Sequence, residues 1–565
     1  MQRSSGRHFC MGVRNVNQHF KLLIAFSSLW TIPAIADTAL HNVVGYTPTN
    51  DGIVKFSVLV FNDTGRVVSA GGERLLDAIP AHSRIDGGGS FVLPGLTDAH
   101  AHLYNQGLLA ISLDLTGVPS LDAAVQRIDE YASERRAGWV LGRGWNQVLW
   151  PTREFPTAAD IDAVVTERPV WLRRIDGHAG WANSTALQIA GVDDKTPDPV
   201  GGKIIRDTNG HATGVLVDRA MALVQKHVPA ADRTDIRQAY LLAIESLLEL
   251  GLTGVHDAGI NKTEAEVYLS MADNDELDMR IYAMLSGAGA NLAAFDVPIR
   301  HYGDDKLDIA AVKLYADGAL GSRGAAMLEP YDDDDENRGL PFWTQEQLDG
   351  FVQIANAKGF QVGIHAIGDL GNRMALDAFE RAQDGRPSPL RNRIEHAQII
   401  TLDDIPRFAE LGVIASMQPT HATSDMNMAE DRIGTQRIKG GYAWRRLLDS
   451  GAMIASGSDF PVELPNPFHG LHAAVTRQDR SDLPEDGWYR NQAMTRAEAL
   501  YSFTLAAAYA AHQEERLGSL EPGKWADFIL LDRDFFTIPV SDIDDIQVRQ
   551  TWVGGKLVYD AAATE

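Results

Sequence analysis

The sequence is poor in cysteine: the single cysteine of the 565-residue chain is Cys10. Residues 1–36 are typical of a signal peptide, with basic residues and no acid, an apolar segment at 22–32, and small residues before Asp37. Cleavage there would remove Cys10, so the mature chain could form no disulfide and could not bind a metal through a thiolate. We therefore expect a periplasmic or secreted protein.

Two alternatives stay open for this first segment. It could be a basic tail with a short anchor, and Met11 offers a second start that would shorten the basic part. The apolar segment at 22–32 is too short to span a bilayer as a helix. We expect no stable membrane insertion once the segment is removed.

The chain also lacks an excess of positive charge. Lysine and arginine total 51 against 76 acidic residues, which gives a formal net charge of -25. Nucleic acids and anionic membranes need clustered basic residues, so neither is expected as a partner. The composition, 45% hydrophobic and 22% charged, is ordinary for a soluble globular protein. A chain of this length is expected to hold one large domain and a smaller one.

The two ends of the mature chain resemble each other. Short β-prone runs at 55–61 and 66–70 are separated by turn residues, and similar runs occur at 527–531 and 548–553. We therefore predict that segments 37–94 and 511–565 pair into one small β-sandwich domain.

The middle of the chain, from 95 to 510, alternates apolar strands with helical stretches, which favours a parallel α/β fold. Eight strand candidates end in polar residues, as expected of a (β/α)8 TIM barrel with its active site at the carboxyl ends of the strands. They are residues 96–102, 170–176, 254–257, 309–316, 361–365, 393–396, 413–417 and 453–459. Because further strand candidates occur at 139–141 and 279–284, the assignment of the second and third barrel strands stays open.

The first barrel strand carries two histidines, His100 and His102, separated by one residue. Alternate side chains of a strand leave the same face, so both imidazoles would point into the same space and could chelate a divalent cation. A chance pair in a chain with 17 histidines is the alternative.

Lys313 lies inside an otherwise apolar strand. Burial of an unpaired ammonium is costly, so this lysine is expected to be paired, neutral or chemically changed. A neutral lysine can add carbon dioxide and become a carbamate, which is an anionic ligand able to bridge two metals. A snorkelling or salt-bridged structural lysine is the alternative.

Three more strand ends carry candidate ligands. His365 and His396 lie one barrel repeat apart, and Asp459 follows the last strand. Asp459 could equally cap a turn, and Asp369 is expected to cap the following helix. Together the order His-x-His, Lys, His, His, Asp suits a hydrolytic site with two metals, in which a carboxylate moves the proton of a metal-activated water.

The chain at this point resembles the amidohydrolase superfamily, and within it amidohydrolase family 3, the branch that includes the N-substituted formamide deformylases. The resemblance covers nearly the whole mature chain. It rests on segments 94–102, 176–183, 313–323, 365–369, 395–397, 457–461 and 517–527. It implies a distorted (β/α)8 barrel joined to a β-sandwich made from both termini.

The resemblance also implies roles for single residues. His100 and His102 would bind one metal, His365 and His396 a second, and carboxylated Lys313 would bridge them. Asp459 would be a metal ligand and the general base, then the acid. Further residues implied near the substrate are His178, Arg323 and Asp317, with His178 either contacting the reacting group or making a structural hydrogen bond. Members differ in using one or two metals, so an unmodified Lys313 would favour one.

The aromatic residues Trp145, Trp150, Trp181 and Phe460 lie near predicted strand ends and could form an apolar pocket, with a core role as the alternative. We expect a metal-dependent hydrolase, with zinc as the default metal, that cleaves a non-peptide carbon–nitrogen bond of a small linear or cyclic amide. The alternatives are hydrolysis of a carbamate or ester, deamination, or a non-catalytic protein that binds metal or ligand for regulation. Whether the protein forms a homo-oligomer stays open.

Overall fold

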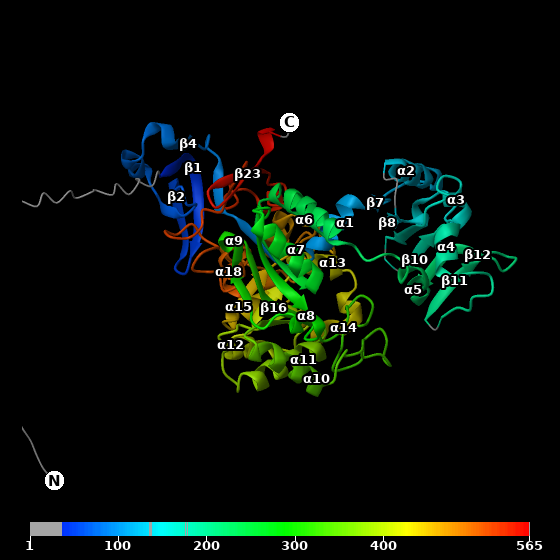
Figure 1. The fold of residues 1–565 in the computed structure, drawn as a ribbon. Helices are drawn as coiled ribbons and strands as arrows, with labels where there is room; N and C mark the ends of the chain where they lie inside the picture. Colours follow the sequence, from blue (N-terminus) through cyan, green and yellow to red (C-terminus); the bar gives the residue numbers. More distant parts are fainter. Residues whose placement is uncertain (1–36, 135–137, 176, 178, 200, 564–565) are drawn as a thin grey trace, which may run out of the picture. The chain divides into compact units, whose positions relative to one another are not determined.

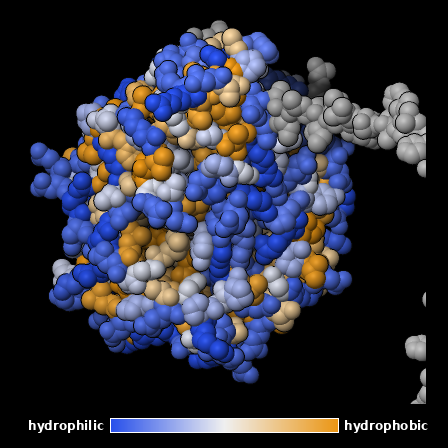
Figure 2. Space-filling view, turned by 90° about the vertical axis from the view of Figure 1, so that its left-hand side faces the viewer, coloured by the Kyte–Doolittle hydropathy of each residue, from blue (hydrophilic) through white to orange (hydrophobic). Residues whose placement is uncertain are grey.

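The computed structural model describes residues 37–134, 138–175, 177, 179–199 and 201–563 (Figure 1). The predicted signal peptide lies outside these residues. Among the described helices, none is both long enough and apolar enough to cross a membrane. Figure 2 shows one face of the molecule, on which hydrophilic residues surround smaller hydrophobic areas.

Both ends of the chain build one mixed sheet, as predicted. Its order is β23-β22-β21-β5-β1-β2-β3, with β4 beside β1. The junction between the two ends is the antiparallel pair β5 and β21, in which Phe91 faces Leu531 and Pro94 faces Phe528. The strands are β1 (Thr38–Thr49), β2 (Gly52–Phe61), β3 (Val67–Gly71), β4 (Arg84–Asp86), β5 (Phe91–Pro94), β21 (Phe528–Leu531), β22 (Val548–Val553) and β23 (Lys556–Asp560).

Eight parallel strands form a nearly closed barrel in the order β20-β19-β18-β17-β16-β14-β13-β6. They are β6 (Leu96–Ala101), β13 (Leu252–Ile260), β14 (Arg280–Ser286), β16 (Leu307–Tyr315), β17 (Gln361–Ala366), β18 (Arg393–His396), β19 (Ile414–Met417) and β20 (Ile454–Ser456). The short β15 (Ile299–His301) pairs antiparallel with β16. Each of these eight strands is buried at all of its residues or at all but one, which explains their largely apolar character.

The first and last barrel strands are joined at their carboxyl ends by Asp98. Its carboxylate accepts hydrogen bonds from the backbone N–H of Ser458 at 3.0 Å and from the hydroxyl of Ser458 at 2.6 Å. The backbone N–H of Asp459 donates to the carbonyl of His100 at 2.8 Å. This closure brings residues that are far apart in the sequence to the same edge of the barrel.

Helices follow most barrel strands, and several begin with capping side chains. Asp232 caps α6, Asn261 caps α7 and Thr344 caps α10, each with a reciprocal acidic or amide residue three positions later. The helices of this region are α1 (Leu103–Ile111), α6 (Arg233–Leu248), α7 (Lys262–Asp273), α8 (Ala290–Ala293), α9 (Tyr302–Asp305), α10 (Gln345–Ala357), α11 (Asp369–Ala382), α12 (Ile405–Leu411), α13 (Pro419–Asp425), α14 (Ala429–Arg437), α15 (Trp444–Asp449), α16 (Pro467–Thr476), α17 (Arg496–Ser502) and α18 (Leu505–Ala510).

A separate sheet lies between the first two barrel strands in the sequence. Its order is β11-β12-β10-β9-β8-β7, and it has a hydrophobic core of its own. Its elements are β7 (Leu113–Asp114), α2 (Leu121–Glu134), β8 (Val140–Trp145), α3 (Ala158–Asp162), β9 (Val170–Arg174), β10 (Ala179–Ala182), α4 (Ser184–Ala190), β11 (Gly202–Arg206), β12 (Ala212–Asp218) and α5 (Ala222–Gln225). We call it the inserted module.

The inserted module corrects one predicted barrel strand. Residues 170–176 were expected in the barrel, but β9 pairs with β8 and with the antiparallel β10. The missing barrel strand is β14, which was one of the further candidates. A short buried strand has the same apolar pattern in either sheet, so hydrophobicity alone could not assign β9.

Candidate metal centre

The carboxyl ends of the barrel strands open into one cavity of about 350 Å³. Five of the six predicted ligands line it: His102, Lys313, His365, His396 and Asp459. The sixth, His100, lies directly behind them, because its ring nitrogen Nε2 is 3.1 Å from Lys313 Nζ. The barrel therefore collects all six side chains, which come from β6, β16, β17, β18 and the loop after β20.

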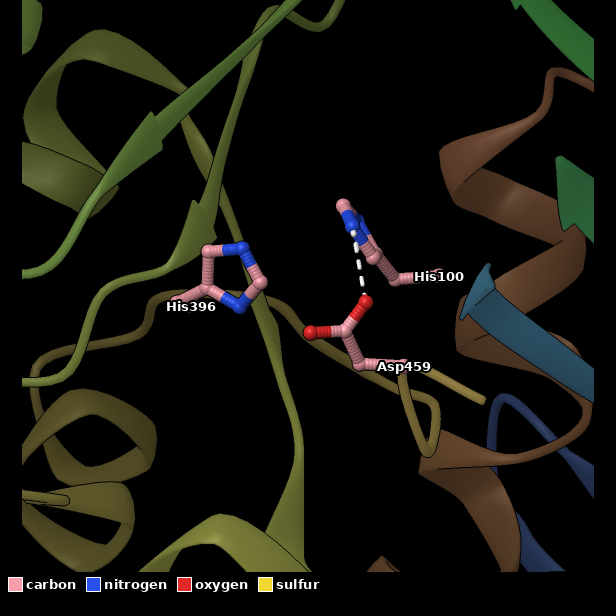
Figure 3. A group of neighbouring side chains, drawn as sticks. All are labelled: His100, His396 and Asp459. Atoms are coloured by element: carbon pink, nitrogen blue, oxygen red, sulfur yellow. Dashed lines mark ion pairs between the residues drawn. The ribbon is translucent and has the colours of Figure 1, made fainter. Parts of the chain in front are cut away.

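His100, His396 and Asp459 form the tightest group (Figure 3). Each offers one ligand atom, and these atoms lie within 4.8 Å of one another. His100 Nε2 is 3.6 Å from Asp459 Oδ1, and the rings of His100 and His396 are 4.8 Å apart. All three residues are buried. Imidazole and carboxylate at this spacing are a ligand set that suits zinc and related divalent metals.

His102 and His365 extend this group on either side. His102 Nε2 lies 3.1 Å from Asp459 Oδ1, and the rings of His100 and His102 are 5.6 Å apart. The ring of His365 lies 4.5 Å from that of His396. The predicted common face of His100 and His102 is thus present in the structure.

Lys313 is almost completely buried and lies at the centre of these histidines. Burial lowers the pKa of its amine to about 8, against the opposing charges of Glu395 and Asp459. Near neutral pH a fraction of this lysine is therefore neutral, which is the form that can react with carbon dioxide.

The protonation states favour metal binding. Burial and the charge of Lys313 lower the pKa of His100 to about 4 and that of His365 to about 3, so both rings are neutral near pH 7. Burial alone would raise the pKa of Asp459, but the hydrogen bond from His102 and the charges of nearby histidines outweigh it and lower the pKa to about 2. Neutral imidazoles and an ionised carboxylate are the forms that bind metals.

Two buried ring nitrogens of the cavity make no hydrogen bond with the described residues: His365 Nε2 and Nε2 of a further histidine, His421. Buried polar atoms are nearly always hydrogen-bonded, so a convergent set without such partners indicates that a ligand completes it. The residues present therefore fit a divalent metal.

The sequence analysis did not select Glu395, although it is fully buried beside the predicted ligands. Its Oε2 lies 2.5 Å from His100 Nδ1, and Arg393 Nε lies 2.5 Å from its Oε1. Arg393 and its neighbours hold the pKa of Glu395 well below its usual range, despite burial. A carboxylate on the second ring nitrogen orients a metal-binding histidine and increases its basicity. In the sequence, a role for Glu395 was indicated by the presence of two charged residues, Arg393 and Glu395, inside the short strand β18.

His421 was also missed. It lies in α13, its Nε2 is 3.7 Å from Asp459 Oδ2, and its ring stacks on that of His396 with centroids 5.8 Å apart. Nothing in the sequence around His421 resembles a ligand motif. Only the position of α13 after β19 brings this ring to the cavity.

Asp317 and Arg323, predicted near the substrate, are engaged with the protein itself. The Asp317 carboxylate accepts hydrogen bonds from the backbone N–H groups of Ala326, Ile367 and Gly368 at 2.8 to 3.0 Å. Arg323 makes a two-pronged ion pair with Asp333, at 3.0 and 2.8 Å. These contacts order the loops beside the cavity.

The aromatic residues expected to form an apolar pocket lie in cores instead. Trp145, Trp150 and Trp181 pack against one another inside the inserted module, and the ring N–H of Trp145 donates to the carbonyl of Leu172 at 2.8 Å. Phe460 is fully buried in the barrel core. These positions agree with the alternative given in the sequence analysis, in which the aromatic residues belong to a core. His178 lies outside the described residues.

Asp369 is not the cap of its helix. The residue before α11 is Gly368, with no side-chain cap, and the Asp369 carboxylate accepts instead from the backbone N–H of Leu328 at 2.7 Å. The helix begins one position earlier than expected, so Asp369 is its first residue rather than its cap.

Comparison with known proteins agrees with this geometry. The model of the amidohydrolase family matches residues 84–559. The chain is 35% identical to the protein LONG AFTER FAR-RED 3 of Arabidopsis thaliana over 93% of this chain and 92% of that protein. It is 28% identical to the N-substituted formamide deformylase of Arthrobacter pascens over 88% of this chain and 94% of that one.

Among solved structures, a metal-dependent hydrolase of Pyrococcus horikoshii superposes with a TM-score of 0.76 at 28% identity, covering 89% of this chain and 99% of the other. The family match begins at β4 and ends within β23, so it covers the barrel and every predicted metal ligand but leaves out β1, β2 and β3. The chain therefore belongs to the amidohydrolase family.

Proposed function

We propose that the protein is a metal-dependent hydrolase that cleaves a non-peptide carbon–nitrogen bond in a small amide, such as an N-substituted formamide. The observation that carries this proposal is the buried carboxylate of Asp459, which shares one cavity with His102, His365 and His396. The similarity to the formamide deformylase supports an amide as the substrate class.

His100, His102, His365, His396 and Asp459 would hold one or two divalent ions, with zinc as the proposed metal. The metal supplies a water of lowered pKa and polarises the substrate carbonyl. The low pKa of Lys313 supports a carboxylated lysine as a further ligand. Glu395 keeps the ring of His100 in place through its contact with Nδ1.

Asp459 is the proposed proton carrier. Its carboxylate is ionised and follows the last barrel strand, β20. Its Oδ1 lies 3.6 Å from His100 Nε2 and 3.1 Å from His102 Nε2. It would take a proton from the attacking water and deliver it to the leaving nitrogen. This transfer needs only one carboxylate, because the same group is regenerated when the amine leaves.

The walls of the cavity support a small substrate with an apolar part. Tyr315, Leu320, Ile367 and Val462 are among the residues that line it. A volume of about 350 Å³ is at the lower end of small-molecule sites. We propose that these residues contact the N-substituent, in place of the tryptophans of the inserted module. The composition of residues 1–36 supports a periplasmic or secreted location.

The proposal is tested by loading the purified protein with zinc, with and without bicarbonate, and assaying a panel of formamides, lactams, carbamates and esters. Metal content is measured on the same samples. We expect hydrolysis of amides that depends on metal, and more bound metal with bicarbonate. Stoichiometric metal with no hydrolysis across the panel would favour the non-catalytic alternative, and hydrolysis confined to esters would replace the amide as substrate class.

A further inference from the structure

His421 is one of the polar residues of the cavity to which the proposed mechanism gives no role. It is nearly buried, and its Nε2 points at the cavity without a hydrogen bond to a described residue. The distance from Nε2 to Asp459 Oδ2 is 3.7 Å. An unpartnered buried nitrogen beside the proposed proton carrier indicates a contact with something bound there.

The other ring nitrogen of His421 belongs to a chain of buried polar groups. Nδ1 lies 3.2 Å from the side-chain amide of Gln398, whose other end lies 3.4 Å from the hydroxyl of Tyr442. That hydroxyl donates to Asp425 Oδ2 at 2.5 Å. Asp425 is one helical turn from His421 in α13, so both ends of this series of hydrogen-bonded groups lie on the same helix.

The direction of hydrogen bonding along this chain follows from a count of protons. Tyr442 has one hydroxyl proton, and burial together with the charge of Asp425 raises the pKa of Tyr442, so the phenol keeps it. The short contact to the Asp425 carboxylate holds this proton. The Tyr442 oxygen can then only accept from Gln398.

Gln398 must therefore present its NH₂ group to Tyr442. The oxygen and nitrogen of a glutamine amide have nearly the same shape, so their placement is decided by the hydrogen bonds around them. With NH₂ toward Tyr442, the amide oxygen faces His421 and accepts a hydrogen bond from Nδ1–H. With Nδ1 as the donor of the ring, Nε2 is left as the acceptor, and it lies in the cavity.

We propose that His421 Nε2 accepts a hydrogen bond from the N–H of the substrate amide and holds the leaving nitrogen beside Asp459. Gln398 and Tyr442 are positioning residues, because they act only through the ring of His421. The inference rests on the proposed function and narrows its substrate class: the preferred amide carries one substituent on nitrogen and keeps one N–H.

The test compares N-cyclohexylformamide with N-cyclohexyl-N-methylformamide in the zinc-loaded protein. We expect kcat/KM to favour the first by at least about tenfold, since the tertiary amide leaves Nε2 without a donor. His421→Phe, which keeps a ring against His396, should remove this preference and retain the bound metal. His421→Gln, which offers an amide oxygen, should restore part of it, and Tyr442→Phe should reduce it by a smaller factor.

His211→Gln is the control for a histidine substitution, because His211 lies on the surface of the inserted module beside Asp194. It should leave both rates unchanged. If His421→Phe loses metal, His421 is a metal ligand and the inference is overturned. It is also overturned if the wild type hydrolyses both amides with equal kcat/KM or prefers the tertiary one. That result is expected if Asp425 is protonated and the hydrogen bonds through Tyr442 and Gln398 point in the opposite direction.

Binding separates this inference from the proposed function. Equilibrium binding of the two amides is measured calorimetrically in the zinc-loaded Asp459→Asn protein, which is not expected to turn them over. If the wild type hydrolyses neither amide but the secondary one still binds about tenfold more tightly, the proposed function fails and the role of His421 stands. Equal binding of both amides overturns the role of His421 whether or not hydrolysis is seen.

Discussion

The two ends of the barrel differ in how completely their buried charged groups are hydrogen-bonded. At the amino end, Arg280 at the start of β14 makes a two-pronged ion pair with Asp527, at 2.5 and 2.8 Å. Asp527 accepts a further hydrogen bond from the backbone N–H of Gly554 at 2.7 Å, and the guanidinium of Arg280 lies over the ring of Trp525. Both charges of this pair are satisfied by the protein itself.

At the carboxyl end, the buried ring nitrogens His365 Nε2 and His421 Nε2 lie in one cavity without hydrogen bonds to described residues. The comparison distinguishes two roles of a buried charged group. A pair that is fully hydrogen-bonded attaches the terminal sheet to the barrel, whereas an incomplete set is held ready for a ligand. The following substitutions test this distinction, from the largest expected effect to the smallest.

Asp459→Asn should have the largest effect on activity. It keeps the size of the side chain but removes the proton acceptor, so we expect turnover to fall by about 10²- to 10⁴-fold while most of the bound metal remains. Steady-state kinetics and metal analysis of the same preparation measure both quantities. Activity equal to that of the wild type would exclude the proposed role of Asp459.

Arg280→Met should have the largest effect on stability. It leaves Asp527 buried beside an apolar side chain, and loss of one partner of a buried pair costs about 3–5 kcal/mol in the free energy of unfolding. Urea unfolding measures this cost, and kcat of the folded protein should not change. The double variant Arg280→Met with Asp527→Asn is the control and should recover part of the loss. If Arg280→Met instead lowered kcat at unchanged stability, the two ends would not differ as described.

Glu395→Gln should weaken metal binding. The contact of Glu395 with His100 Nδ1 orients a proposed ligand, and loss of such a partner costs about 10- to 100-fold in metal affinity. Competition with a chelator measures the affinity. Ser416→Ala is the matched control, because Ser416 contacts Arg393 at 2.6 Å without contacting His100. Equal metal affinity in all three proteins would show that Glu395 serves the fold alone.

Arg323→Met should have the smallest effect. Arg323 pairs with Asp333 at a partly exposed position, and such pairs contribute about 0–1 kcal/mol to stability. Thermal unfolding and kcat/KM toward the preferred amide should both change little. A loss of activity of tenfold or more at unchanged stability would instead support the prediction, made from the sequence, that Arg323 contacts the substrate.

Much of the barrel was predictable because each strand carries its own signature. The strands that end in His100, Lys313, His365, His396 and Asp459 were placed from local apolar runs followed by polar residues, and these runs match β6, β16, β17, β18 and β20. The same reasoning misplaced β9, since an apolar run records burial but not the neighbour that causes it.

The supporting residues were harder to predict than the ligands. Glu395 follows no spacing rule with His100, because the two meet only where β18 and β6 approach each other across the barrel. His421 and Tyr442 lie on different elements, and their connection through Gln398 depends on side chains that meet in space. The aromatic residues were expected in a pocket, whereas their ring contacts show Trp145 and Trp181 packed in a core.

The amino-acid sequence alone determined which residue types are available for chemistry: a single cysteine at position 10, histidines at strand ends and one lysine in an apolar strand. These follow from composition and from the two-residue period of a strand, which are local properties. The tertiary structure decided which of these groups share a cavity, which are satisfied by partners, and which nitrogen of His421 lies there without one. Those outcomes depend on distances between segments hundreds of residues apart, and only closure of the barrel sets them.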